Sequence, residues 1–251
     1  MFANNPSNTA VPSTGPVLIV VATYNERENL PKLVDLILQH APRADLLVVD
    51  DNSPDGTGTW AQQHAANEPR LHVHSRAGKL GLGSAIIMAM QQAVAEGYDY
   101  LLNLDADFSH DPASIPQLIA GMAASDSGPG ADVMIGSRYM PGGRTVGWPW
   151  YRQLVSRLLN TYTRWMLRLP LRDCSSGFRC FRTATLAKLD WGQVRSHGYA
   201  FHEEILWHVK RAGARFGETP IVFTERRAGR SKINLKEAWS AVSMITRLGI
   251  G

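Results

Sequence analysis

The sequence predicts an α/β protein in which a mostly parallel β-sheet carries helices on both of its faces. Short apolar segments alternate with longer segments of helical periodicity from residue 17 to residue 135, and this alternation is typical of parallel strands joined by helices. Polar loops follow three of the apolar segments, at residues 23–26, 50–57 and 105–107. Since ligands of such sheets bind beyond the carboxyl ends of the strands, we expect these loops to share one functional edge.

Each element expected in this first part rests on a local pattern. Apolar runs predict buried strands, and helices are expected where apolar residues recur at three- and four-residue spacing. The strands are Val17–Ala22, Leu46–Val49, Leu71–His74, Leu101–Leu104 and Val133–Ile135, and the helices are Glu28–His40, a segment ending at His64, a segment that opens at the glycine loop Gly78–Gly83 and runs to Glu96, and Pro112–Ala123.

The pattern changes after residue 140. Residues 150–169 predict a basic amphipathic helix, with apolar residues on one side and Arg157, Arg164 and Arg168 on the other. Such a helix suits a membrane interface, and it equally suits packing on the domain with the arginines in water. Two further helices, at Phe201–Arg211 and Leu235–Arg247, are expected on either side of a short strand, Ile221–Thr224.

The chain is expected to contain one folded domain. The division predicted is a disordered leader at residues 1–16, an α/β domain at 17–235 and an amphipathic helix at 236–251. The leader is rich in Asn, Pro, Ser and Thr and lacks the charged and apolar regions of a secretory signal. The longest apolar run, Val17–Ala22, is far shorter than the roughly 20 residues that span a bilayer. A cytoplasmic location is therefore expected.

Arginine is concentrated in one segment. Residues 138–182 contain nine Arg, no Lys and one acidic residue, Asp173, which gives a net charge of +8 against +4 for the whole chain. Guanidinium groups bind phosphate in a bidentate way, so the segment favours a phosphate-bearing ligand. Nucleic acid is the rival ligand, but no aromatic stacking platform or helix-turn-helix accompanies the arginines, and no nucleic-acid partner is expected.

Two carboxylates follow the fourth strand. Asp105 and Asp107 are separated by Ala106 alone, and residues two apart in an extended chain point to the same side. Oxygen ligands of this kind suit Mg²⁺ or Mn²⁺, which commonly takes further oxygens from a substrate diphosphate. Taken alone, the pair is also compatible with a polar turn. The sequence carries neither a P-loop nor a Rossmann glycine fingerprint, which disfavours kinases and dehydrogenases.

These features together resemble family 2 glycosyltransferases of the GT-A fold, and within them the polyprenol (dolichol) phosphate mannosyltransferases. Seven motifs in family order carry the resemblance over about residues 17–235: Ala22–Leu30, Val49–Thr57, Gly78–Gly83, Asp105–His110, Gly136–Tyr139, Cys174–Arg179 and Arg226–Lys232. The chain departs from the frequent family pattern at Ala22, where Pro is common, and at Ser109, where Gln is common.

The resemblance implies a role for individual residues. The donor-binding residues that it implies are Ala22, Tyr24, Glu26, Val49, Asp51, Asp105, Ala106, Asp107, Arg226 and Lys232. The metal ligands that it implies, for Mg²⁺ or Mn²⁺, are Asp105, Asp107 and Ser109. The acceptor phosphate would be held by Arg138, Arg152 and Ser156, and the catalytic residues would be Asp107 and Arg138.

The activity that the resemblance implies is inverting transfer of mannose from GDP-mannose to a polyprenyl phosphate, giving a β-linked mannosyl lipid. The acceptor phosphate is already an anion at pH 7, so it can attack the sugar without a general base, and catalysis rests on positioning and on stabilising the leaving group. Two alternatives stay open: a polyprenyl-phosphate glucosyltransferase that uses UDP-glucose, and a non-catalytic nucleotide-sugar-binding subunit. The intact Asp105, Asp107, Arg138 and Lys232 favour an enzyme.

The expected partners follow from this activity. They are GDP-mannose, the polyprenyl phosphate lipid and a membrane surface, with a membrane-anchoring protein subunit as a further candidate. The protein is expected to associate peripherally with the cytoplasmic face of a membrane, through its basic amphipathic helices, through a partner subunit, or through both.

Overall fold

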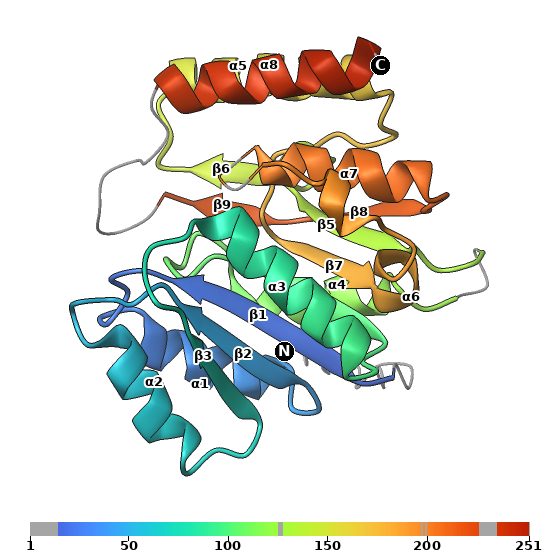
Figure 1. The fold of residues 1–251 in the computed structure, drawn as a ribbon. Coiled ribbons are helices and arrows are strands. Elements are labelled where there is room, and N and C mark those ends of the chain that lie inside the picture. Colours follow the sequence, from blue (N-terminus) through green and yellow to red (C-terminus); the bar gives the residue numbers. More distant parts are fainter. Residues whose placement is uncertain (1–14, 125–127, 197, 199, 226–234, 251) are drawn as a thin grey trace, which may run out of the picture.

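The computed structural model describes residues 15–124, 128–196, 198, 200–225 and 235–250. In this part of the chain, a seven-stranded sheet lies between helices, and a small two-stranded sheet lies close to two long helices that cross one side of the molecule (Figure 1). The strands are β1 (Val17–Thr23), β2 (Asp45–Asp50), β3 (Leu71–Ser75), β4 (Tyr100–Asn103), β5 (Val133–Ser137), β6 (Arg144–Val146), β7 (Arg179–Arg182), β8 (Phe216–Pro220) and β9 (Val222–Thr224). The α-helices are α1 (Leu30–His40), α2 (Thr57–Ala65), α3 (Leu82–Ala95), α4 (Ile115–Ala120), α5 (Trp150–Leu167), α6 (Thr183–Leu186), α7 (Phe201–Arg211) and α8 (Leu235–Ile250), and the 3₁₀ helices are η1 (Pro112–Ser114) and η2 (Trp191–Gln193).

The sheet has the order β3-β2-β1-β4-β7-β5-β8. Strands β1, β2, β3 and β4 pair in parallel, as do β5 and β8, whereas β7 runs antiparallel to both of its neighbours. The predicted mostly parallel sheet is confirmed. The sequence did not predict β7, because its four residues begin and end on arginine and interrupt the apolar pattern that indicates a buried strand.

Helices cover both faces of the sheet, as predicted, and β1 shows why. Its residues alternate between two buried clusters: Val17, Ile19 and Val21 face the cluster built with α1 and α4, while Leu18 and Val20 face the cluster built with α3 and α7. Successive side chains of a strand point to opposite faces, so an unbroken apolar run requires a core on each side. This arrangement brings the carboxyl ends of β1, β2 and β4 to one edge.

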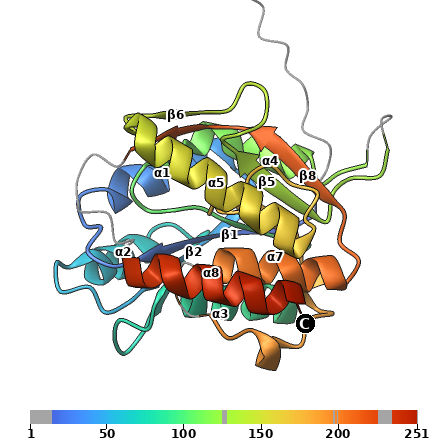
Figure 2. The same cartoon turned by 90° about the horizontal axis from the view of Figure 1, so that it is seen from above.

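Helices α5 and α8 lie side by side across one side of the molecule (Figure 2). The Tyr162 hydroxyl and the Thr246 hydroxyl, 2.6 Å apart, join them. Leu167 of α5 and Met244 and Ile245 of α8 are buried in the same cluster as residues of α3 and α7. Both helices are therefore packed on the domain. Among the described residues, no helix combines the length and the hydrophobicity that crossing a membrane requires.

The exposed side of α5 is apolar, which differs from the sequence expectation. The exposed apolar side chains on this helix are Trp150, Tyr151, Leu154, Val155, Leu158, Leu159 and Trp165. Arg157 and Arg164 are exposed as well, beside this apolar face rather than opposite to it, since successive helical residues are about 100° apart. The buried side consists of Asn160, Thr163 and Leu167. A helix packed on the domain was expected to turn its apolar residues toward the core. Instead, Asn160 and Thr163, whose side chains form hydrogen bonds, make up most of the buried side.

Candidate active site

Three loops meet at the edge formed by the carboxyl ends of β1, β2 and β4. The loops after β1 and β2 are joined by backbone-to-side-chain hydrogen bonds from Asn25 N–H to Ser53 Oγ (3.0 Å) and from Arg27 N–H to Asp55 Oδ2 (3.0 Å). Each of the three loops contains a non-glycine residue with positive φ: Asn25 (61°), Asn52 (56°) and Phe108 (59°). For Phe this backbone conformation is strained. The predicted clustering of the polar loops at one edge is confirmed.

The Asp105–Asp107 turn is held by the residues that follow it. The Ser109 N–H donates to Asp107 Oδ1 at 3.0 Å, and the Asp105 N–H donates to His110 Nδ1 at 3.3 Å. The Asp105 carboxylate also lies against Gly177: a Cβ at that glycine would be 3.2 Å from Asp105 Oδ1. The lack of a side chain at residue 177 thus lets the chain pass close to this carboxylate.

These residues fit a divalent cation that takes part of its coordination shell from a substrate. Asp105 and Asp107 supply carboxylate oxygens, and the buried Ser109 Oγ has no hydrogen-bond partner in the described part of the chain. Within that part, no group of three or more His, Cys, Asp or Glu side chains could hold a metal ion by itself. Mg²⁺ and Mn²⁺ at diphosphate sites commonly use one or two protein carboxylates plus phosphate oxygens and water.

His110 is a neutral imidazole beneath this turn. Its side chain is buried, and burial lowers its pKa even though Asp105 and Asp107 oppose the effect. Its Nδ1 accepts a backbone hydrogen bond, so the ring proton lies on Nε2. The ring packs against Phe178 and Phe223, at centroid distances of 5.2 and 5.3 Å.

The residues expected to hold the nucleotide lie on or beside the same edge. The Asp51 carboxylate forms a buried ion pair with Arg76 and accepts the Gly81 N–H at 3.2 Å. This pair holds the glycine loop, to which the sequence analysis assigned no individual role, against the end of β2. The Arg76 guanidinium also donates to Ser84 Oγ at 2.7 Å. The carboxylate of Asp51 is thus already hydrogen-bonded within the protein.

The other expected donor residues differ in exposure. Lys79 Nζ lies 4.1 Å from the centre of the Tyr24 ring, and Glu26 Oε2 accepts from Asn29 Nδ2 at 2.8 Å. Ala22 is half-buried, Ala106 is buried, and Val49 is fully buried. Arg226 and Lys232 lie outside the residues that the structure describes.

Arg138 is held by a buried carboxylate. Its Nε and Nη2 donate to the two oxygens of Asp173, both at 2.7 Å, and its backbone N–H donates to Asp173 Oδ2 at 3.0 Å. Burial alone would raise the pKa of Asp173, but the Arg138 guanidinium and its hydrogen bonds hold that pKa below its usual value. Burial alone would lower the pKa of Arg138, but the charge of Asp173 and its hydrogen bond raise that pKa above its usual value. The cation is therefore fixed in place.

The other two expected acceptor residues lie one helical turn apart on α5, beside Arg138. Ser156 Oγ accepts from the Tyr139 hydroxyl at 2.6 Å. Arg152 donates to Glu225 at 2.6 Å, and its Cζ lies 4.2 Å from the centre of the Trp148 ring. The Cζ of Arg138 lies 5.5 Å from the centre of that same ring. The structure thus brings Arg138, Arg152 and Ser156 together around two aromatic rings.

Comparison with known proteins agrees with this arrangement. The family model described as glycosyl transferase family 2 matches residues 18–190. The chain belongs to glycosyltransferase family 2. An undecaprenyl-phosphate mannosyltransferase of Micrococcus luteus is 41% identical over 234 residues, which is 93% of this chain and 94% of that protein. A polyprenol monophosphomannose synthase of Mycolicibacterium smegmatis is 41% identical over 230 residues, covering 90% of this chain and 85% of that protein.

Solved structures share the fold of this glycosyltransferase. Glucosyl-3-phosphoglycerate synthase from Mycobacterium tuberculosis, in complex with Mn²⁺, uridine diphosphate and glucosyl-3-phosphoglycerate, matches 98% of this chain and 85% of that chain with a TM-score of 0.66 and 19% identity. The same enzyme with Mn²⁺ and UDP-glucose matches 93% of this chain and 78% of that chain, with a TM-score of 0.65 and 20% identity. The predicted GT-A fold is confirmed.

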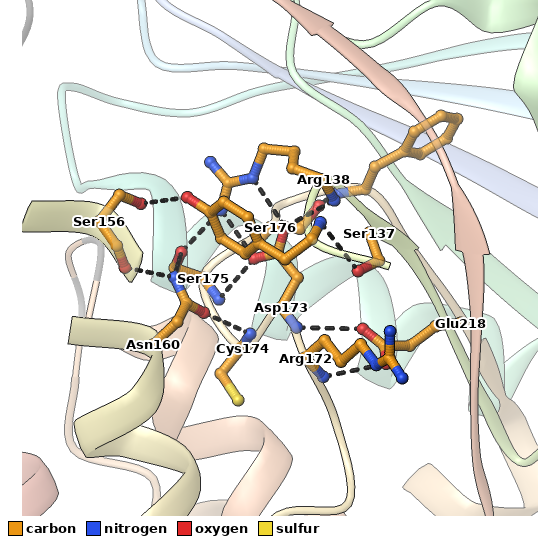
Figure 3. A network of polar contacts seen from close by, with 12 residues as sticks. Ser137, Arg138, Ser156, Asn160, Arg172, Asp173, Cys174, Ser175, Ser176 and Glu218 are labelled. Carbon is orange, nitrogen blue, oxygen red and sulfur yellow. Dashed lines mark hydrogen bonds and ion pairs between the residues drawn. The ribbon is translucent and has the colours of Figure 1, made fainter. Parts of the chain in front are cut away.

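Sequence reasoning missed the residues that hold the glycosyltransferase's arginine-rich site together (Figure 3). Asn160 Nδ2 donates to Ser175 Oγ at 3.0 Å, and Ser175 Oγ accepts from Arg138 at 2.7 Å. Glu218 accepts the backbone N–H groups of Arg172 and Asp173 at 2.9 and 3.0 Å. One sequence signal was available: Asp173 is the sole acidic residue in the Arg-rich segment 138–182, and a lone acid among arginines indicates a shared counterion.

Arg179 lies beneath this part of the glycosyltransferase. It is fully buried, and its guanidinium donates to the carbonyl oxygens of Cys174 (2.7 Å), Ser176 (2.7 Å) and His202. Burial lowers its pKa to about 10. The side chain thus connects the 174–176 loop to the start of α7 and fixes the backbone that carries Ser175, a hydrogen-bond partner of Arg138.

Proposed function

We propose that this glycosyltransferase transfers mannose from GDP-mannose to a polyprenyl phosphate, with inversion at the sugar C1. The observation that carries the proposal is the placement of the acceptor residues. Arg152 and Ser156 lie on the inner side of α5, next to Arg138, while the outer side of the same helix is apolar. An acceptor with an anionic head and a hydrocarbon tail fits this arrangement, because its head would bind the arginines of the inner side and its tail would lie near the apolar outer side. The identity of 41% to two polyprenyl-phosphate mannosyltransferases, over most of each chain, supports the same assignment.

The mechanism assigns separate tasks to the two halves of the site. The loops after β1 and β2 hold the nucleoside, and the Asp105–Asp107 turn holds the cation that the donor diphosphate requires. When bound, Mg²⁺ or Mn²⁺ stabilises the negative charge that develops on the leaving GDP. Arg138, oriented by Asp173, and Arg152 place the acceptor phosphate for attack at C1. No side chain has to remove a proton, because the acceptor phosphate is an anion at pH 7.

The proposal includes peripheral association with the cytoplasmic face of a membrane through α5. Trp150 and Trp165, at opposite ends of the exposed apolar face, are 75% and 74% exposed. Tryptophan is enriched where a protein meets the bilayer interface, and arginines beside the apolar face attract anionic lipids. A membrane-anchoring subunit could occupy part of the same face.

The test is transfer of labelled sugar to a polyprenyl phosphate, with GDP-mannose and UDP-glucose offered in parallel, with and without EDTA. We expect mannolipid from GDP-mannose alone, lost on chelation and restored by Mg²⁺ or Mn²⁺. Asp107→Asn should lower the rate on the order of 100-fold or more, because it removes a charge that holds the cation. Asp111→Asn, an exposed carboxylate four residues on that caps η1, is the matched control and should retain the activity.

The other outcomes separate the alternatives. Glucolipid from UDP-glucose would reassign the enzyme to the glucosyltransferase branch. Binding of GDP with no product from either donor would indicate a binding subunit and overturn the proposed transfer.

A further inference from the structure

Strand β9 touches both halves of the site. The Thr224 N–H donates to the Ser109 carbonyl at 3.1 Å, and Phe223 forms an isolated antiparallel bridge with His110. On its other side β9 pairs with β6, and Glu225, directly after the strand, forms the ion pair with Arg152. The strand is thus hydrogen-bonded to the metal-binding turn and adjoins the acceptor arginines.

The Phe223 side chain makes contacts on both sides at once. Its ring stands edge-to-face against His110, with centroids 5.3 Å apart, and edge-to-face against Trp148, also at 5.3 Å. The Cζ of Arg138 lies 5.3 Å from the centre of the same ring. One half-buried phenyl ring therefore touches the imidazole under the Asp105–Asp107 turn and the acceptor-side guanidinium.

Two buried donors around Phe223 have no hydrogen-bond partner in the described part of the chain. They are His110 Nε2 and Trp148 Nε1, and both rings contact Phe223. An aromatic face can accept a weak hydrogen bond from N–H and attracts a guanidinium. An aliphatic side chain of similar volume at residue 223 offers neither interaction, so replacing the ring removes an aromatic contact from His110, Trp148 and Arg138 at once.

We propose that Phe223 is a positioning residue that aligns the metal-binding turn with the acceptor-phosphate arginines. It acts through His110 on the Asp105–Asp107 turn, and through Trp148 and Arg138 on the acceptor side. The inference rests on the proposed function, because it assumes that a donor-bound cation and an acceptor phosphate use these two halves. In-line transfer requires the acceptor phosphate and the donor sugar to lie in a defined position relative to each other. A ring that contacts both halves of the site helps to maintain that relative position.

The experiment compares Phe223→Leu with Phe216→Leu. Phe216 is half-buried on the short strand β8, and the control removes the same atoms away from the site. In Phe223→Leu we expect about a 3- to 10-fold weaker affinity for Mn²⁺ in the presence of GDP, measured by electron paramagnetic resonance of free Mn²⁺, and a rise of similar size in the KM for the polyprenyl phosphate. GDP binding without metal should change by less than about twofold, since the ring contacts of Phe223 described above are with His110, Trp148 and Arg138.

The outcomes distinguish this inference from the proposed function. An active wild-type enzyme whose Phe223→Leu variant changes neither constant, or only one, overturns the coupling. If the wild-type protein makes no glycolipid, the proposed function fails, and an unchanged Mn²⁺ affinity in the variant would overturn the metal side of the coupling independently. Phe223→Met, whose flexible unbranched side chain adapts to the space left by the ring, provides the same two readouts if the Leu variant lowers the Tm.

Discussion

At the residue scale, the Arg138–Asp173 pair is the most fully buried ion pair of the proposed acceptor side. Asp173 is fully buried and Arg138 is 6% exposed. Removing two charges from water costs several kcal/mol per ion, so such a pair contributes more to orientation than to net stability. Because both carboxylate oxygens and three donors of Arg138 are used, the guanidinium has one defined position before any acceptor arrives.

Replacing the carboxylate tests this role. Asp173→Asn leaves the Arg138 cation buried without a counterion, and we expect the free energy of unfolding to fall by about 3–5 kcal/mol. Urea unfolding followed by circular dichroism measures the change. Arg172→Gln, at the exposed neighbour whose backbone alone is hydrogen-bonded here, should change it by less than about 0.5 kcal/mol. A loss below about 1 kcal/mol for Asp173→Asn would mean that water reaches the guanidinium.

The sequence predicted the charged groups of the site better than their partners. Spacing singled out Asp105 and Asp107 as a pair, but it expected them in an extended chain, whereas β4 ends at Asn103 and the chain turns directly after it. The partners of Arg138 and Arg152 are Asp173 and Glu225, 35 and 73 residues away along the chain. Periodicity contains no information about contacts at that separation, so Glu225 emerges only from the fold, and the one sequence signal for Asp173 is that no other acidic residue lies in segment 138–182.

At the element scale, the two sides of α5 differ in the residues that they present. Its inner side holds Ser156 and Asn160 in the hydrogen-bond network of the proposed acceptor site. Its outer side exposes apolar residues such as Leu158, which is 61% exposed. Large contiguous exposed apolar surface marks a contact region, and the exposed arginines beside it fit the anionic membrane surface that we propose.

Charge removal on this helix tests the membrane contact. Arg157→Gln combined with Arg164→Gln should weaken binding to vesicles containing anionic lipid by about 1 kcal/mol per arginine, roughly 30-fold in total, at physiological salt. Sedimentation with sucrose-loaded vesicles measures the binding. Lys32→Gln with Arg43→Gln removes two exposed charges from the α1 side and is the control. Equal binding by the two double variants would eliminate α5 as the docking element.

The regular strand and helix units were predictable, whereas three of the short strands were not. Six expected strands, β1 to β5 and β9, and the long helices follow apolar patterns, and the structure has them within a few residues of the expected bounds. Strands β6, β7 and β8 contain only three to five residues each and include Arg, Glu, Gly or Pro. Their strand conformation is imposed by neighbours that offer backbone hydrogen bonds, which is a tertiary effect.

At the scale of the whole molecule, one carboxyl group makes folding stability depend on pH near neutrality. Burial raises the pKa of Glu203 to about 7, against the attraction of Arg179 and Arg138. Between its ordinary pKa near 4.5 and this value, the folded chain holds a proton that the unfolded chain has released. This contribution to stability is complete below about pH 4.5 and is lost as the pH rises through 7.

Glu203→Gln removes this dependence. The variant should unfold at a temperature on the order of 5 °C above the wild type at pH 8, and at nearly the same temperature at pH 4.5. Differential scanning calorimetry across this range measures both proteins, and the difference cancels the contributions of His110 and His202. Glu28→Gln, at an exposed position, should give no pH-dependent difference. A difference that is the same at both pH values would contradict the assignment to Glu203.

The antiparallel strand β7 determines the order in which the native sheet can be completed. The strands β1 to β4 are contiguous in the first part of the chain, but the native neighbour of β4 is β7, and β5 joins the sheet only through β7. During synthesis from the N-terminus, the β4 edge therefore stays without its native partner until residues 179–182 have left the ribosome. Exposed strand edges are sites of mispairing. The centre of the finished sheet thus closes late, ahead of only the pairing of β8 with β5, and the nascent protein most needs protection from aggregation before that centre has formed.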